Sequence, residues 1–377
     1  MTQPLYKGVA HPQKMQADAN AGLWFTRFFN EFDDKWTVGD KAKTNWIDTL
    51  SGKRGNEEMI AKMANSLSKL GASLGAEIRY FKTDWHFATG LGLSHPVENG
   101  FTWHQTLGVP YLPASGVKGL LRGWVEAWMD HDSDTDKHAM INRWFGAVEN
   151  KLGAKENSAG NLIFFDAIPT KPVTLACDIM TPHMGKWYEK GGDIKSEDDY
   201  ADAAPADWHS PVPVPFLVVK QANFRCMIAP RLIGDDAHDT QAKQDAKAAM
   251  EQLSLALQWI GAGAKTAAGY GRFTEDSPEA EARKKELQEQ EKRKQQEESA
   301  ELWAGVTIKF NRGNGTLEVT SKNNQKAYAY KENGVAESLL NTLLSATKTK
   351  ILQNAYVKVN ARVSGTSLLS VEDIPKA

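Results

Sequence analysis

Hydrophobic positions near the start of the chain recur at helical spacing. Trp24, Phe28 and Phe32 are four residues apart, and apolar residues repeat the pattern between Ile60 and Leu70. Spacings of three and four place such side chains on one face of a helix. Residues 1–78 are therefore predicted to be a helical N-terminal elaboration that packs on a sheet.

The pattern changes to alternation near Arg79. Apolar and aromatic residues alternate with polar ones from Phe81 to Phe87, which is typical of a strand with one buried face. Residues 79–184 are predicted to form a first α+β domain. Its further expected elements are a strand within Gly100–Leu112, a helix over Gly116–Met129 with Ser115 as its cap, a helix around His138–Phe145, and strands over Gly160–Ala167 and Val173–Met180.

Residues 185–211 mix Gly, Asp and Pro without periodicity, so we expect a mobile acidic insertion. Residues 212–275 then predict a second α+β domain. Its expected elements are strands over Val214–Gln221 and Asn223–Leu232, a helix over Thr240–Ile260, and a glycine-rich loop followed by a strand over Tyr270–Phe273. Each half has strands and helices arranged to pack in two layers.

A charged helical linker is predicted over residues 276–302, which contain mostly Glu, Lys, Arg and Gln. Without hydrophobic heptad positions it is not a coiled coil. Residues 303–377 predict three strands, a helix and two strands, the order of a small five-stranded OB-like barrel. Its candidate RNA contacts are Lys309, Arg312, Tyr328 and Tyr330, with Phe310 as a further exposed aromatic. A role in the barrel core is at least as common for such aromatics.

Composition narrows the class of protein. Hydrophobic residues make up 41% and charged residues 24% of the 377 residues, as in an ordinary water-soluble globular protein. No apolar run approaches a membrane span and the N-terminus lacks a signal-peptide core, so we expect a cytoplasmic protein without a membrane partner. The two cysteines, Cys177 and Cys226, have no CxxC motif and are expected to be buried free thiols.

The net charge of −2 hides a segregation of charge. Residues 303–377 carry ten Lys and Arg against five Asp and Glu, whereas acidic residues concentrate in Asp130–Lys137 and Glu189–Asp207. Outside these two stretches the first 274 residues are also net basic. This pattern fits a cationic surface with separate acidic loops.

The loop Ile260–Phe273, IGAGAKTAAGYGRF, has four glycines around Lys265. Glycine allows positive φ and close approach of the backbone to another molecule, so the loop is a candidate for binding an anionic backbone. A nucleotide-binding P-loop is excluded, since Trp259 and Ala264 occupy the required glycine positions and a helix precedes the loop. A tight turn rich in small residues is the alternative.

The predicted helix after Ser115 carries Lys118 and Arg122 one turn apart. Lys118 lies in the first turn, beside free backbone donors and the positive end of the helix dipole, so the pair forms a candidate phosphate seat. An exposed, solvated pair of cations is the more common arrangement.

Metal and hydrolase motifs are absent. Asp132, Asp134 and Asp136 resemble the start of a calcium loop, but Lys137 and Arg143 stand where glycine and glutamate are required. The histidines form no HExxH, so neither a metal nor a cofactor is expected. His95 and His104 flank a predicted hairpin and leave open a metal-independent endoribonuclease with a histidine base.

Five stretches occur in an order that carries a family resemblance: Gly90–Gly92, PYLPASGVKGLLRG at Pro110–Gly123, FFDA at Phe164–Ala167, DIMTPH at Asp178–His183, and the glycine-rich loop. Over residues 18–274 the chain resembles the RAMP superfamily of CRISPR proteins. Within it, the chain is most similar to the family of the sixth RAMP subunit of type III-B (Cmr) effector complexes. The charged linker and the basic C-terminal domain depart from the usual shorter form.

The resemblance implies two ferredoxin-like, RRM-related domains and a non-catalytic, RNA-binding role in antiviral defence. Such a subunit holds the 3′ part of the crRNA guide and caps the backbone filament, with target RNA, the backbone RAMP subunit and the small helical subunit as partners. An endoribonuclease that processes precursor crRNA is the alternative. The predicted RNA-binding residues are Ser115, Lys118, Arg122, Gly261, Gly263, Lys265, Thr266, Gly269, Tyr270, Gly271 and Arg272, with His95 and His104 as further candidate contacts.

Overall fold

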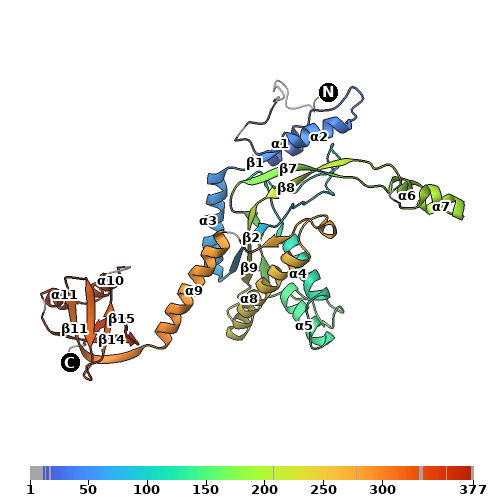
Figure 1. The fold of residues 1–377 in the computed structure, drawn as a ribbon. Coiled ribbons are helices and arrows are strands. Elements are labelled where there is room, and N and C mark those ends of the chain that lie inside the picture. Colours follow the sequence, from blue (N-terminus) through green and yellow to red (C-terminus); the bar gives the residue numbers. More distant parts are fainter. Residues whose placement is uncertain are drawn as a thin grey trace. The chain divides into compact units, whose positions relative to one another are not determined.

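The computed structural model describes residues 12, 14–16, 18–206, 208–276, 278–330, 334–353 and 355–374 (Figure 1). The chain divides into two units, Met1–Glu281 and Ala282–Ala377. Parts of the predicted regions lie outside the described residues, namely residues 1–11, 13 and 17 of the N-terminal elaboration, residue 207 of the acidic stretch, residue 277 of the linker, and residues 331–333, 354 and 375–377 of the C-terminal domain.

Three helices, α1 (Ala21–Arg27), α2 (Asp40–Asp48) and α3 (Glu57–Leu74), confirm the predicted helical start. The side chains of Asn20 and Asn56 accept hydrogen bonds from the first turns of α1 and α3, which satisfies free helix donors. The predicted helix through Trp24, Phe28 and Phe32 was too long, because α1 ends at Arg27, before Phe28. A short strand, β1 (Gly52–Arg54), was not predicted.

Strand β9 (Asn223–Pro230) is the centre of the main sheet, whose order is β10-β2-β9-β5. Its neighbours are β2 (Glu77–Thr83) and β5 (Leu162–Phe164), β10 (Phe273–Thr274) follows at one edge, and β6 (Ile168–Pro169) also pairs with β9. Every residue of β9 after Asn223 is buried. The sheet combines strands from residues 79–184 and 212–275, so the boundary between these ranges does not separate two sheets.

A second sheet has the order β1-β7-β8, in which β7 (Val173–Met180) and β8 (Val214–Gln221) form a long antiparallel pair. The predicted first strand continues only as an isolated bridge between Phe87 and Val219, because β2 ends at Thr83. Within Gly100–Leu112 the structure forms only a small hairpin of β3 (Trp103–His104) and β4 (Val109–Pro110). Both predicted strands were therefore too long.

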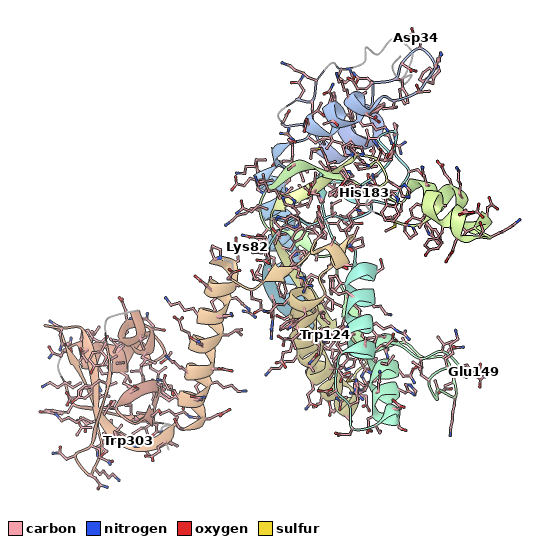
Figure 2. The ribbon with its side chains drawn as sticks, turned by 45° about the vertical axis from the view of Figure 1, so that its right-hand side comes forward. Asp34, Lys82, Trp124, Glu149, His183 and Trp303 are labelled. Atoms are coloured by element: carbon pink, nitrogen blue, oxygen red, sulfur yellow. The ribbon has the colours of Figure 1, made fainter. Side chains whose placement is uncertain are left out.

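Helix α8 (Asp236–Trp259) packs along α4 (Ala114–Ala127), which is followed by α5 (Asp134–Phe145). The predicted apolar stripe of α8 is buried. Trp124 of α4, labelled in Figure 2, points from that helix. It donates from Nε1 to Oε1 of Gln252 at 2.8 Å and thereby connects the two helices. The prediction that Ser115 caps α4 was wrong, since the N-cap is Pro113 and Ser115 lies inside the first turn.

The segment 185–211 contains regular structure, unlike the aperiodic insertion expected from its composition. It forms α6 (Gly185–Lys190), a 3-10 turn η1 (Gly191–Asp193) and α7 (Glu197–Ala203) between β7 and β8. Ser196 and Asp199 form a capping box at the start of α7. The buried His209 lies 2.9 Å from the Ala204 carbonyl through Nε2, and its own carbonyl lies 2.7 Å from Nδ1 of His183. Short helices of this kind depend on local caps more than on apolar periodicity.

The second unit contains a closed five-stranded barrel of order β11-β12-β13-β15-β14. The strands are β11 (Glu301–Asn311), β12 (Thr316–Thr320), β13 (Lys326–Ala329), β14 (Val357–Ser364) and β15 (Ser367–Asp373). Two helices, α10 (Val335–Asn341) and α11 (Ser345–Leu352), replace the single predicted helix. Helix α9 (Pro278–Glu298) forms within the stretch that was predicted to be a charged helical linker. The barrel has its own buried aliphatic core.

Two further features of the structure concern membrane-spanning helices and the two cysteines. In the described part of the chain, no helix is long and apolar enough to cross a membrane. Both cysteines are free, but only Cys226 is fully buried, whereas Cys177 is half-buried. Burial raises the pKa of the Cys226 thiol to about 12 and that of Cys177 to about 11, so both thiols are protonated and unreactive near neutral pH.

Asp245 on α8 is the centre of a buried polar network. Its side chain is 3% exposed and accepts hydrogen bonds from Arg143, Trp144 and Asn161 at 2.9 to 3.2 Å. Burial alone would raise the pKa of Asp245, but these hydrogen bonds, with Arg143 the strongest, lower it below its ordinary value. The network joins α5, the start of β5 and α8.

Replacing Asp245 by alanine is expected to reduce the free energy of unfolding of the first unit by about 3 kcal/mol at neutral pH, because the buried donors lose their acceptor. The difference from wild type should shrink as the pH falls below about 4, because a lowered carboxyl pKa contributes stability that is lost on protonation. Urea unfolding at several pH values measures this. Glu251→Ala, an exposed site on the same helix, is the control, and equal losses at both sites would contradict the prediction.

Candidate nucleic-acid interface

Three segments that are far apart in the sequence line one groove of about 550 Å³. They are the turn Thr89–Gly92, the start of α4 with Ser115 and Gly116, and the glycine-rich loop at residues 260–264 and Thr266, whereas Lys265 is not among the lining residues. Each belongs to a motif that the sequence analysis identified separately. The structure therefore brings the helix motif and the glycine-rich loop to one surface.

Close backbone contacts explain three of the four loop glycines. Gly261, Gly263 and Gly271 all have positive φ, and a Cβ atom on any of them would overlap a backbone carbonyl oxygen. For Gly263 the obstacle is the oxygen of Ala88, and for Gly271 it is that of Ala262. Gly269 also has positive φ, at 92°, but a Cβ there would meet no atom within 4 Å. The first three glycines are thus required for packing as well as for backbone conformation.

Most amides of the loop bond within the protein. Ala262 donates to the Gly271 carbonyl, Ala264 to that of Ala88 and Gly271 to that of His86, each at 2.7 Å. These bonds fasten the loop to itself and to the segment that follows β2. Among the described residues, the loop amides without a backbone acceptor are those of Gly263, Lys265, Thr266, Ala267 and Arg272. Three of these donors are consecutive, at the start of the 3-10 turn η2 (Thr266–Ala268).

Lys265 adopts the left-handed conformation, with φ of 60°, immediately before η2. Its Nζ atom lies 2.9 Å from the sulfur of Met180 and 5.3 Å from the centre of the Phe216 ring. The ammonium group thus rests on the β7–β8 sheet, and the side chain is half-buried. A cation–π contact holds it without neutralising its charge.

A carboxylate anchors the far end of the loop. Asp178 accepts a hydrogen bond from the Tyr270 hydroxyl at 2.7 Å, and its Oδ2 lies 3.0 Å from Nδ1 of His86. Burial acts to raise the pKa of Asp178, but the bonds from Tyr270, the Ile179 amide and His86 outweigh it and lower the pKa. Burial and the bond to Asp178 raise the pKa of Tyr270 to about 12. Sequence reasoning missed this pairing, although DIMTPH begins with Asp178.

The two predicted cations of α4 have partners away from the groove lining. Lys118 donates from Nζ to the Phe145 carbonyl at 2.9 Å, at the carboxyl end of α5. Arg122 pairs with Glu126 one turn later at 2.7 Å. Ser115 is exposed and lines the groove, whereas Lys118 and Arg122 are not among the lining residues. Helix-end carbonyls are common partners of lysine, and this role requires no ligand.

The two candidate histidines lie in the packed N-terminal region. His95 stacks on Phe25 at 4.0 Å, its Nε2 lies 2.8 Å from the Phe25 carbonyl and its Nδ1 accepts from the Val97 amide. Burial lowers the pKa of His95. His104 accepts from the Leu107 amide through Nδ1 inside the β3–β4 turn. These contacts give both residues structural roles. The described residues contain no cluster of three or more potential metal ligands.

In the barrel, Tyr328 and Tyr330 stack with ring centres 6.2 Å apart. Tyr330 is 59% exposed and Tyr328 is half-buried. Lys309 is exposed, and Arg312 donates to the Leu352 carbonyl. Phe310 packs against the barrel core, which is the alternative role that the sequence analysis gave for these aromatics.

Gly263→Ala and Gly269→Ala form a matched pair for the loop, because both glycines have φ near 90°. Gly269→Ala should cost about 1 kcal/mol for the left-handed conformation alone. Gly263→Ala should cost several times more, because the new methyl also overlaps the Ala88 carbonyl. Chemical denaturation measures both. Similar losses would show that the loop is not held by backbone contact.

Tyr270→Phe is expected to reduce the free energy of unfolding by about 1 kcal/mol, because Asp178 loses a hydrogen bond in a partly buried site. The pKa of Asp178 should rise, which NMR titration measures. A pKa raised to about 12 stabilises the folded protein below pH 10 and loses this effect between about pH 10 and 12. The difference between wild type and Tyr270→Phe should therefore shrink over that range, and a constant difference would contradict the assignment.

Two characterised relatives are similar to this chain. One is the CRISPR system Cmr subunit Cmr6 of Pyrococcus furiosus, 26% identical over 266 residues, covering 58% of this chain and 73% of that protein. The other is the corresponding subunit of Saccharolobus solfataricus, 25% identical over 223 residues, covering 57% of this chain and 64% of that protein. The matched region thus spans less than two thirds of the second relative.

Solved structures are also similar. A Type III-B Cmr-beta complex bound to cognate target RNA contains a chain with a TM-score of 0.46 and 22% identity, covering 65% of this chain and 77% of that chain. The crystal structure of Cmr6 from Pyrococcus furiosus gives a TM-score of 0.28 and 24% identity, covering 53% of this chain and 97% of that chain. The sequence model of the RAMP superfamily matches residues 80–274, more than half of the chain. The protein therefore belongs to the RAMP superfamily.

Proposed function

We propose that this protein is a non-catalytic, RNA-binding subunit of a type III-B CRISPR ribonucleoprotein. In this role it holds the 3′ part of the crRNA guide and caps the backbone filament in antiviral defence. The two relatives named Cmr6 support the assignment to this class of complex. The partners that follow are the guide, the target RNA, the backbone RAMP subunit and the small helical subunit.

The convergence of three sequence motifs on one groove is the observation that carries this proposal. In the described part of the chain, the amide of the groove-lining residue Thr266 has no backbone acceptor, and neither have the amides of its neighbours Lys265 and Ala267. Amides and a cation together bind phosphate oxygens without reading the base. Such a site suits a guide whose sequence is read by base pairing.

The proposal assigns different roles to the predicted contacts. Lys265, which lies in the chain between the groove-lining residues Ala264 and Thr266, holds a phosphate together with the η2 amides, and the Ser115 hydroxyl lines the same groove. Tyr270 positions the loop through Asp178. Gly261, Gly263 and Gly271 act by permitting close packing, and Gly269 by its backbone conformation. Lys118 and Arg122 contribute to the field around the groove from their positions on α4.

The proposal also includes a more detailed assignment of the fold of each unit. The first unit is interpreted as two ferredoxin-like, RRM-related halves that share the sheet around β9. The barrel is interpreted as OB-like, since the order β11-β12-β13-β15-β14, with helices between β13 and β14, is that of the five-stranded OB barrel. Its stacked Tyr328 and Tyr330 offer a second surface for RNA, and Lys309 of β11 pairs with the same β12 residue, Glu318, as Tyr328 of β13.

The endoribonuclease alternative needs a histidine that is free to act as a base. Both ring nitrogens of His95 already have partners, and burial lowers its pKa. His104 is bonded within a turn through one nitrogen. These contacts favour a binding function over precursor processing.

Salt-dependent binding of single-stranded RNA to the full-length protein tests the proposal. Lys265→Ala should weaken binding at all sequences and reduce the slope of log K against log salt by about one, because one fewer phosphate is neutralised. Fluorescence anisotropy with a labelled RNA measures both quantities. Lys62→Ala, an exposed lysine on α3, is the control and should leave the slope unchanged.

Two outcomes would contradict the proposal. Equal slopes for wild type and Lys265→Ala would remove the loop from the RNA interface. Specific cleavage of repeat RNA in EDTA, lost in His95→Ala or His104→Ala, would establish the enzyme instead.

A further inference from the structure

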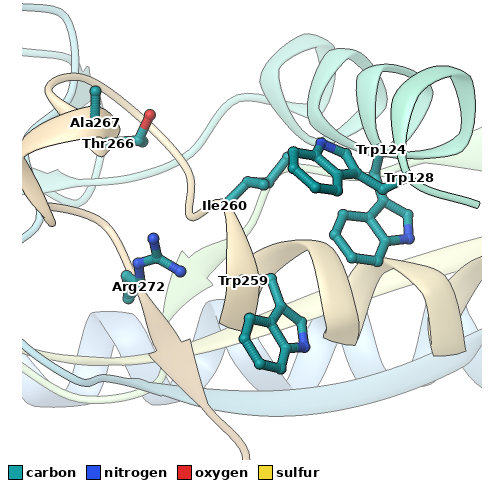
Figure 3. A pocket seen from close by; sticks show the side chains of 7 residues that line it. All are labelled: Trp124, Trp128, Trp259, Ile260, Thr266, Ala267 and Arg272. Carbon is teal, nitrogen blue, oxygen red and sulfur yellow. The ribbon is translucent and has the colours of Figure 1, made fainter.

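A second cavity, of about 460 Å³, adjoins the glycine-rich loop and is lined by three tryptophans. Trp124 and Trp128 come from α4, Trp259 ends α8, and Arg272 follows the loop (Figure 3). Ile260, Thr266 and Ala267 complete the lining. The sequence motifs did not predict a site formed by tryptophans, although Thr266 and Arg272 were predicted RNA contacts.

The exposure of two of these indoles requires an explanation. Trp128 is 64% exposed and Trp259 is 61% exposed, whereas Trp124 is 8% exposed and bonds to Gln252. Trp124 therefore belongs to the packing between α4 and α8. Trp128 stacks on it at 6.3 Å, with an interplanar angle of 18°, and leaves its outer face open. Large exposed aromatic surfaces of this kind mark binding sites more often than stable surface.

The polar groups around the indoles are suited to an anion. The seven lining residues include one charged side chain, the cation Arg272, and no acid. Arg272 uses Nη1 to bond the Gln258 carbonyl at 3.0 Å, which fixes the guanidinium beside the cavity. Thr266 and Ala267 bring the amides that have no backbone acceptor in the described part of the chain. Aromatic faces, a guanidinium and free amides together match a nucleotide, with its flat base and charged phosphate.

The cavity shares two lining residues with the proposed RNA groove. Ile260 and Thr266 line both, so the two sites lie on adjoining sides of the same loop. A strand whose phosphate is held at the loop places a neighbouring nucleotide within reach of the indoles. A covering protein segment would explain the apolar surface but not the cation and amides that border it.

From this geometry we infer that Trp128 and Trp259 form a stacking site for an unpaired base of single-stranded RNA, with Arg272 on its phosphate. The inference rests on the proposed RNA-binding function and adds a specific subsite to it. Stacking on an aromatic face accepts any base, so the site fixes the path of the strand rather than its sequence. Bases held here are withdrawn from pairing.

Photo-crosslinking of the full-length protein with single-stranded RNAs that contain 5-iodouridine at successive positions tests this inference. A base that stacks on an indole should crosslink to peptides containing Trp128 or Trp259, which mass spectrometry identifies. Trp128→Ala with Trp259→Ala should remove the crosslink and weaken binding roughly five- to hundredfold, since stacking contributes about 1–3 kcal/mol per base. The salt slope should stay unchanged because no charge is removed.

Two variants serve as controls. Trp128→Phe with Trp259→Phe keeps aromatic faces and should retain most of the affinity. Trp208→Ala removes a tryptophan that is 73% exposed and outside the cavity, and it should leave both crosslink and affinity unchanged.

The outcomes separate the two proposals. If the protein binds RNA with the predicted salt dependence but neither crosslinks at these tryptophans nor responds to the double substitution, the stacking site is wrong and the RNA groove stands. If wild type binds no RNA, both are wrong. If the double variant binds RNA normally but no longer joins the other subunits, the cavity is a protein interface and the stacking site is overturned.

Discussion

Backbone-to-backbone contact at Gly263 and Gly271 is the constraint on which the candidate site depends. The carbonyl oxygens of Ala88 and Ala262 occupy the space that a side chain would need. Three short amide bonds, from Ala262, Ala264 and Gly271, then use the donors brought close by this contact. The loop therefore has one conformation set by its packing, and the few amides it leaves unpaired have a defined direction. Preorganised donors bind a ligand without a further cost of ordering the loop.

Tertiary partners decide which cations of the site can reach a ligand. Lys118 and Lys265 are both near helix or turn starts in the sequence, yet the first bonds a helix-end carbonyl and the second rests on Phe216 and Met180. A bond to a carbonyl uses the ammonium as a structural donor. A cation–π contact leaves its outward N–H groups available. Of the two lysines, Lys265 is therefore the one that keeps N–H groups for a ligand, and it lies in the chain between the groove-lining residues Ala264 and Thr266.

The sequence predicted those parts of the structure in which periodicity reports burial directly. The stripe of α8 from Ala242 to Leu257 is buried as expected, and the barrel has the predicted order of three strands, a helical segment and two strands. Alternation from Phe81 to Phe87 continued past the end of β2, because Phe87 is buried against the other sheet through Val219. Burial pattern does not identify the pairing partner, so the shared sheet around β9 could not be predicted. For the same reason, the sequence could not predict that Lys118 bonds to the Phe145 carbonyl.

The two sides of the glycine-rich loop have different chemistry, because the loop packs against different elements on each side. One side faces the turn Thr89–Gly92 and the start of α4, and its lining contains small, aliphatic and hydroxyl-bearing residues but no aromatic side chain. The other faces indoles from α4 and α8, because Ile260 ends the helix directly into the loop. A strand that follows the loop would meet phosphate-binding groups and aromatic faces in succession. Since both surfaces share Ile260 and Thr266, any substitution that moves the loop should alter them together, whereas truncating an exposed indole should affect only one.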